Sequence, residues 1–142
     1  MPVGIPMLMF VSYRHAEQRI LGHLHDRGFT DLTLAQLRIA ARLDDDGSRL
    51  TSLAAAAQVT KQTAGFLVDQ LEKAGYVERR PDPLDARARR IVLGPRGEAV
   101  RVAAREMEEQ LEAEWATHLG PEQMDALHQA LASLREITDP FR

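Results

Sequence analysis

The sequence predicts a mainly α-helical fold, a winged helix-turn-helix with a small antiparallel β-hairpin wing, joined to a helical dimerisation region. Two helix-like segments are separated by only three residues, 58–60, so they must cross steeply. The second segment, 61–74, leads directly into a hairpin-like stretch, 76–94. Long amphipathic segments occupy both ends of the chain. We therefore assign the winged helix-turn-helix to 31–94 and the dimerisation region to 1–30 and 95–142.

Length and composition fit one domain, or one domain with a helical extension, in a chain of 142 residues. The absence of cysteine excludes disulfides, thiolate metal sites and a cysteine nucleophile. The apolar N-terminus lacks a basic region and is broken by Pro2 and Pro6, so it does not resemble a signal peptide. No apolar run approaches the length of a membrane span. We expect a cytoplasmic protein.

Charge is distributed unevenly along the chain, although its net value is only −3. Residues 1–60 carry six basic and six acidic side chains, and residues 61–96 carry eight basic and five acidic ones. Residues 97–142 carry four basic and ten acidic side chains. One basic region in an acidic chain attracts phosphate at that region and repels it elsewhere, which suits docking on DNA through a single face.

The N-terminal half contains two predicted helices. Helical spacing of apolar residues covers about 6–27, and Gly28 supplies a stop. Thr33 is a predicted N-cap for a second helix over 34–43. Its inward residues are expected to be Leu34, Leu37, Ala41 and also Ile39. The acidic stretch 44–48 should form a solvated turn.

The central region gives the helix-turn-helix and the wing. Leu50 is predicted to be buried, with Thr51 capping a short helix over 52–57. Thr60 should cap the helix over 61–74, and Gly75 should end it in a left-handed conformation. Strands are expected at 76–80 and 90–93, with 81–89 as their connector.

The C-terminal helices are predicted to reach from Pro95 to about His118 and from Pro121 to about Thr138. The first has an apolar stripe from Val100 to Trp115, and the second carries apolar residues at spacings of three and four. So small a domain cannot bury both stripes. We expect a second copy of the chain to cover them.

Two groups of polar residues point to DNA contact. Short polar side chains, Gln62 and Thr63, follow Lys61 at a helix N-terminus, where they can reach base edges in a major groove. Arg87 belongs to a thin hairpin that fits a minor groove, and Asp85 can hold its guanidinium. Each feature has a plainer alternative, an ordinary helix start or a charged solvent-facing hairpin.

The chain resembles the MarR family of winged-helix regulators. The resemblance is carried by 32–36, 51–54, 59–63, 67–79 and the aspartate–arginine pair in 82–87. It implies an obligate dimer held by the first and last helices, with recognition helices in successive major grooves and wings in the flanking minor grooves. We therefore expect a homodimeric transcription regulator, a repressor, that binds a pseudo-palindromic operator. Two residues depart from the family pattern: Phe66 replaces a frequent arginine and Gln58 a frequent turn glycine. The candidate DNA-binding residues are Thr51, Ser52, Thr60, Lys61, Gln62, Thr63, Phe66, Asp85, Arg87 and Arg89.

The resemblance also implies a small aromatic or anionic effector between the dimerisation base and the winged lobe. Tyr13, Arg14, Arg42 and Trp115 are candidates for such a cleft, with core or interface packing as the alternative role. The five histidines show no metal-ligand spacing, and we expect no metal or cofactor. Asp82 and Asp85 are interpreted as wing supports rather than as an acid–base pair, so we expect no catalytic residues and no enzyme. A winged-helix module for protein contacts, without a DNA role, remains the alternative function.

Overall fold

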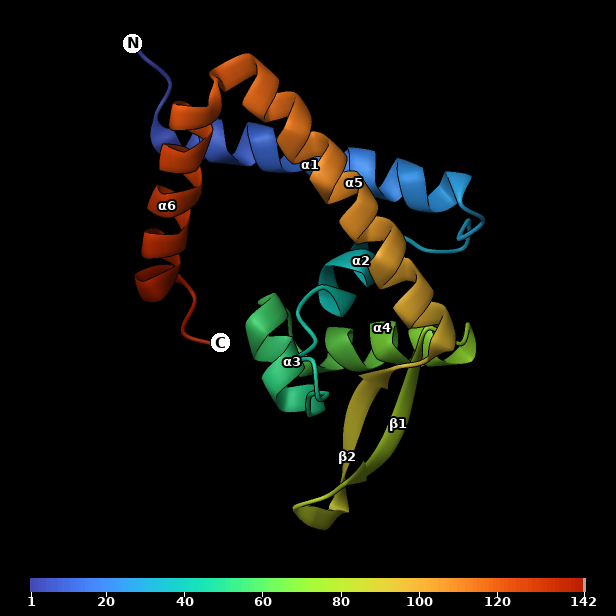
Figure 1. Cartoon of the computed structure of the whole chain (residues 1–142). Coiled ribbons are helices and arrows are strands. Elements are labelled where there is room, and N and C mark those ends of the chain that lie inside the picture. The colour runs from blue at the N-terminus through green and yellow to red at the C-terminus, as the bar shows by residue number, and fades with distance from the viewer. Residues whose placement is uncertain (142) are drawn as a thin grey trace.

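The computed structural model describes residues 1–141, which fold into six helices and one antiparallel hairpin (Figure 1). This confirms the predicted mainly α-helical winged helix-turn-helix. Arg142, the last residue of the predicted region 95–142, lies outside the described residues. None of the helices within 1–141 combines the length and apolarity that a membrane crossing requires. The elements in chain order are α1 (Ile5–Asp26), α2 (Leu34–Ala40), α3 (Leu50–Ala57), α4 (Lys61–Lys73), β1 (Val77–Asp82), β2 (Asp85–Leu93), α5 (Pro95–Leu119) and α6 (Pro121–Thr138).

The predicted stop at Gly28 and the predicted N-cap at Thr33 are confirmed, but α2 is shorter than expected. Gly28 has φ 99° and follows the end of α1. Thr33 caps α2 through the backbone N–H of Gln36, whose side chain in turn accepts from the Thr33 N–H. The prediction that this helix reaches residue 43 was wrong, because the turn after Ala40 tightens into bonds three residues apart. Ala41 is consequently exposed rather than inward-facing.

The helix-turn-helix is formed by α3 and α4. The prediction that Thr51 caps α3 was wrong, because the helix already begins at Leu50, which is only partly buried, and Thr51 lies within its first turn. Gln58 adopts the left-handed conformation with φ 58°, so it fills the turn position at some backbone strain. Thr60 caps α4 by accepting from the Thr63 N–H, and Gly75 has φ 83° just beyond the helix, as expected.

The wing strands are longer than the sequence indicated. The connector predicted for 81–89 was wrong: Pro81 pairs with Arg89, and only residues 83 and 84 lie between the strands. Proline is tolerated there because a two-stranded hairpin has only edge strands, so its missing N–H can face solvent. Arg87 and Arg89 therefore project from β2 instead of from a loop. In Figure 1 the hairpin extends well away from the helices.

The stretch 44–48 is not a wholly solvated turn, which corrects the expectation. Ser48 is buried and forms an antiparallel bridge with Ile91 of β2. Gly47 has φ 95°, and a Cβ atom there would lie 2.7 Å from Val92 Cγ1. The segment before α3 thus packs on the base of the wing, and its glycine is required by both conformation and space.

The core joins the winged lobe to α5. Its fully buried side chains include Leu24 of α1, Ile39 of α2, Leu53 of α3, Val68 and Leu71 of α4, and Val77 and Ile91 of the hairpin. Arg96 at the start of α5 holds Asp31, donates to the Ala74 carbonyl and stacks on the Tyr76 ring at 4.3 Å. No residue of α6 is buried. The apolar side chains Leu127, Leu131 and Leu134 of α6 therefore remain exposed within residues 1–141.

Candidate nucleic-acid interface

The exposed residues at the start of α4 form a polar edge. Lys61, Gln62 and Thr63 are all exposed, while Leu67, Val68 and Leu71 anchor the opposite side of the helix in the core. No acidic residue lies in the first turn of α4, so no carboxylate there neutralises the positive end of the helix dipole. Thr51 and Ser52 are exposed at the start of α3, which packs against α4. The structure thus leaves the predicted α3 and α4 residues accessible.

The second half of α4 is acidic, but its carboxylates are paired. Arg79 of β1 donates to Asp69 at 2.8 Å and to Glu72 at 2.7 Å. These two bonds tie the helix to the wing, and the single guanidinium offsets one of the two negative charges that would repel a phosphate backbone. The sequence analysis did not predict these ion pairs, because Arg79 lies beside α4 only after the hairpin has formed and packed on the helix.

The outer part of the wing presents exposed arginine side chains. The side chain of Arg87 is 93% exposed, and its Nε lies 3.4 Å from Asp85 Oδ1. The same carboxylate oxygen accepts the Arg87 backbone N–H at 3.0 Å. The expected support of Arg87 by Asp85 is therefore present. Arg89 is also exposed, and no ion pair to it is found within residues 1–141.

A buried carboxylate fixes the wing to the helix-turn-helix. Arg49 is the N-cap residue of α3, and its Nε donates a hydrogen bond to Asp82 at 2.8 Å. The backbone N–H of Leu84 donates a second hydrogen bond to Asp82, also at 2.8 Å. Arg90 lies 3.7 Å away on the other strand. These donors, with Arg49 the strongest, hold the pKa of Asp82 below its usual range. Sequence reasoning did not identify Arg49, which lies 33 residues from its partner.

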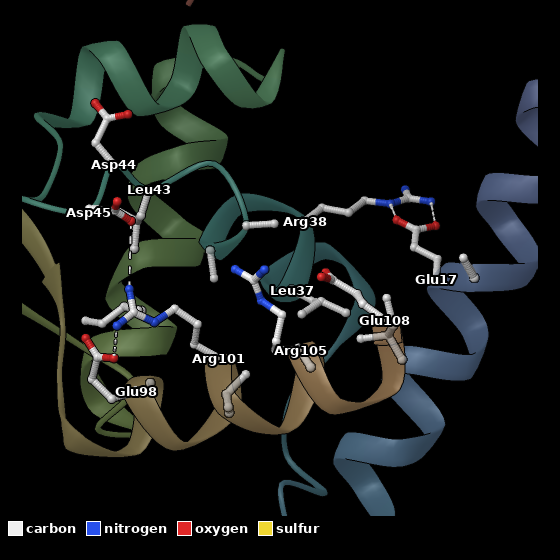
Figure 2. Close-up of a pocket in the computed structure, with 18 of the residues that line it drawn as sticks. Glu17, Leu37, Arg38, Leu43, Asp44, Asp45, Glu98, Arg101, Arg105 and Glu108 are labelled. Carbon is white, nitrogen blue, oxygen red and sulfur yellow. Dashed lines mark hydrogen bonds and ion pairs between the residues drawn. The ribbon is translucent and has the colours of Figure 1, made fainter. Parts of the chain in front are cut away.

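A cavity of about 370 Å³ lies between α1, α2 and α5 (Figure 2). Apolar residues of α1, α2 and α5 line part of it, among them Ile20, Leu37 and Ala104. Arg105 points from α5 into this space, and Arg101 beside it pairs with Glu98 and Asp45. Of the four residues predicted for an effector cleft, Tyr13 lines this cavity, whereas Arg14, Arg42 and Trp115 do not.

Glu17 forms an ion-pair cluster at one wall of the cavity. It is 4% exposed and accepts from Arg38 of α2 at 2.6 and 2.8 Å, from Arg14 at 2.8 Å and from the Tyr13 hydroxyl at 2.9 Å. Bonding to Arg38 is the main reason that the pKa of Glu17 falls to about 2. Burial, followed by the bond to Glu17, raises the pKa of Tyr13. The cluster links α1 directly to α2.

Arg42 has a different role from the one predicted. Its guanidinium donates to both oxygens of Asp139, at 2.6 and 3.2 Å, and its Nε donates to the Ala56 carbonyl. Asp139 follows α6 and also accepts from Arg135. These contacts join the end of α6 to the end of α3, which Figure 1 shows approaching each other. Arg42 thus links Asp139, the residue that follows α6, to the winged lobe.

Comparison with known proteins agrees with this architecture. Residues 30–88 match the sequence model of the MarR family. The transcriptional regulator Tm0710 from Thermotoga maritima is 28% identical, with TM-score 0.64 and coverage of 93% of this chain and 91% of that one. A MarR transcriptional regulator from Methanosarcina mazei Go1 is 21% identical, with TM-score 0.75 and coverage of 93% and 94%. Wild-type MarR from E. coli is 19% identical, with TM-score 0.73 and coverage of 94% and 98%. No curated protein matches significantly.

Proposed function

We propose that this chain acts as a homodimeric, sequence-specific DNA-binding repressor. The proposal is supported by the match of residues 30–88 to the sequence model of the MarR family and by a fold shared with a solved MarR-family transcription regulator that is 28% identical. In this proposal 31–94 contacts DNA, while 1–30 and 95–142 form the dimer. Phosphate contacts come from Thr51, Ser52, Thr60, Lys61 and Arg89. Gln62 and Thr63 read base edges, and Arg87, supported by Asp85, enters the minor groove.

The observation that carries this proposal is the combination of an exposed helix edge with an exposed arginine on the wing that Asp85 positions. Both belong to the one segment of the chain with net positive charge, and Arg79 forms ion pairs with Asp69 and Glu72, the carboxylates on the outer half of α4. A duplex that meets α4 in its major groove therefore encounters cations and hydrogen-bonding groups on the helix and on the wing.

Dimerisation is supported by apolar side chains that residues 1–141 leave uncovered. Met7, Phe10 and Val11 on α1 are each more than half exposed, and Leu127, Leu131 and Leu134 form a stripe on α6. These helices lie on the same side of the molecule, away from the wing (Figure 1). A second copy burying them would place two α4 helices on one duplex, which requires a separation of roughly 34–36 Å. Sedimentation equilibrium should give twice the chain mass of 15.9 kDa, and a monomer at micromolar concentration would contradict the dimer.

Arg87→Ala should weaken DNA binding and flatten its dependence on salt. The side chain is 93% exposed, so the substitution removes a cation without disturbing the core. Losing one phosphate or minor-groove contact per subunit should lower affinity about tenfold or more and reduce the slope of log K against log salt by about 1 per site. The measurement is a salt titration of binding to a duplex selected from random-sequence DNA.

Arg101→Ala is the control, because it removes an arginine whose side chain is 52% exposed but which lies on α5 beside the cavity. It should leave the slope unchanged. Equal slopes for wild type and Arg87→Ala would rule out the wing assignment. Failure of the wild-type protein to select any duplex would instead favour the protein-contact alternative.

We further propose that a small aromatic or anionic effector binds the cavity between α1, α2 and α5 and releases the DNA. The cavity combines an apolar lining with Arg105, for which no ion pair is found within residues 1–141. A ligand there touches both the dimerisation helices and the winged lobe, so it can favour one spacing of the two α4 helices over another. Aromatic carboxylates should raise the midpoint of thermal unfolding of wild type, but not of Arg105→Ala. Absence of any shift across such a panel would oppose this class of effector.

A further inference from the structure

Phe66 is the one large apolar side chain on the exposed face of α4 within the described residues. It is 62% exposed, although it belongs to a helix whose other apolar residues are buried or partly buried. Residues three and four apart share a helix face, so Phe66 lies beside Thr63 and Gln62. It therefore extends the polar edge of α4 by one turn with a group that can neither donate nor accept a hydrogen bond.

No aromatic or cation–π contact to this ring is found within residues 1–141. The contacts of those two kinds in that part of the chain involve Phe29, Tyr76 and Arg96. With 62% of the residue exposed, burial in the core does not account for a phenylalanine at this place. An exposed aromatic side chain among DNA-facing groups indicates a partner surface that offers an apolar contact.

The surrounding charges identify that surface. Lys61 lies ahead of Phe66 on the helix, and Arg79 covers Asp69 and Glu72 behind it. The carboxylates nearest the ring on α4 are thus engaged in ion pairs with Arg79, and the ring belongs to the segment 61–96, whose net positive charge suits a polyanion. The base edges in a major groove present one apolar group, the C5-methyl of thymine, and a phenyl ring is among the side chains that contact it.

We propose that Phe66 reads the C5-methyl group of a thymine in each half-site of the operator, an inference that rests on the proposed DNA-binding function. The contact makes the position specific for thymine by burial of a methyl group rather than by a hydrogen bond. It also gives the chain a means of distinguishing thymine from unmethylated cytosine.

The test replaces thymine with deoxyuridine, which lacks only the C5-methyl group. A duplex is first selected from a random-sequence pool by the wild-type protein, and its thymines are then substituted singly and in symmetric pairs. At one position of each half-site, removing the methyl group should weaken wild-type binding about fourfold, and about sixteenfold when both half-sites are changed. Phe66→Ala should bind the thymine and deoxyuridine duplexes equally, while Phe66→Leu should keep part of the difference.

Leu84→Ala provides the control, since Leu84 is also an exposed apolar residue but lies at the tip of the wing, away from α4. This variant should retain the full effect of deoxyuridine. A selected duplex for which no deoxyuridine substitution changes wild-type affinity would overturn the methyl contact and leave the proposed function intact. Equal losses in wild type and Phe66→Ala would also overturn it, because another residue would then read the methyl group. If no duplex is bound at all, the proposed function fails and this inference fails with it.

Discussion

Replacing Gly97 with alanine is expected to destabilise the protein by about 3 kcal/mol, which is at the upper end for overpacking a close contact. A Cβ atom at this position would lie 2.1 Å from the Tyr76 carbonyl oxygen and 2.9 Å from Leu93 Cδ2. The carbonyl cannot move freely, because it accepts the Gly94 N–H at 2.9 Å. Relief of the clash must therefore shift α5 away from the winged lobe.

The measurement is urea unfolding at a fixed protein concentration, since dimerisation makes apparent stability depend on concentration. Gly22→Ala is the matched control. Gly22 lies within α1 and is exposed, and a Cβ atom there would have no neighbouring atom within 4 Å. Alanine there should stabilise the helix by about 0.5–1 kcal/mol. Similar effects of the two substitutions would show that helix propensity, and not the approach of α5 to Tyr76, governs stability at Gly97.

Glu17→Gln should destabilise the protein by about 2 kcal/mol at pH 7. The pKa of Glu17 falls from 4.5 to about 2 in the folded protein, which corresponds to a few kcal/mol of preference for the charged form. The half-exposed Arg38 weakens this preference by solvent screening, and we reduce the expected value accordingly. The amide keeps the shape of the side chain but loses the charge that Arg38, Arg14 and Tyr13 contact.

The pH dependence tests the cause of this effect. A carboxylate whose pKa is lowered on folding contributes its full stability above its unfolded pKa of 4.5 and loses it as the pH falls towards 2. The difference in free energy of unfolding between wild type and Glu17→Gln should therefore shrink from pH 7 to pH 3. Glu108→Gln changes an exposed carboxylate of the same cavity and should have little effect at either pH. A difference that stays constant with pH would show that Glu17 acts through shape and not through charge.

The helix-turn-helix could be predicted because its signals are local. Thr60 and Thr33 are side chains that cap the helix they precede, and Gly75 permits the left-handed turn that ends α4. The prediction that Thr51 is an N-cap was wrong although it used the same kind of local signal, a threonine before an apolar run. Arg49 occupies the N-cap position instead, and its side chain donates to Asp82. A tertiary ion pair thus outweighed the local capping preference.

The candidate site was predicted in part. Asp85 and Arg87 are two residues apart, so their contact followed from spacing alone. The strands of the wing were underestimated because Pro81 and a cluster of charges look like a loop, while pairing of β1 with β2 accommodates them. The cavity residues were largely missed, since Glu17 and Arg38 meet only when α1 packs beside α2.

The sequence by itself determined the order of the helices, the place of the wing and the basic segment proposed to face DNA, because caps, glycines and charge are read over a few neighbouring residues. The tertiary structure alone decided which charges remain free. Arg87 stays exposed, whereas Arg49 and Arg79 are taken by Asp82, Asp69 and Glu72. It also left Phe66 uncovered while burying every other large apolar residue of α4 within the described chain. Those outcomes depend on contacts between residues far apart in the chain, and no local pattern records them.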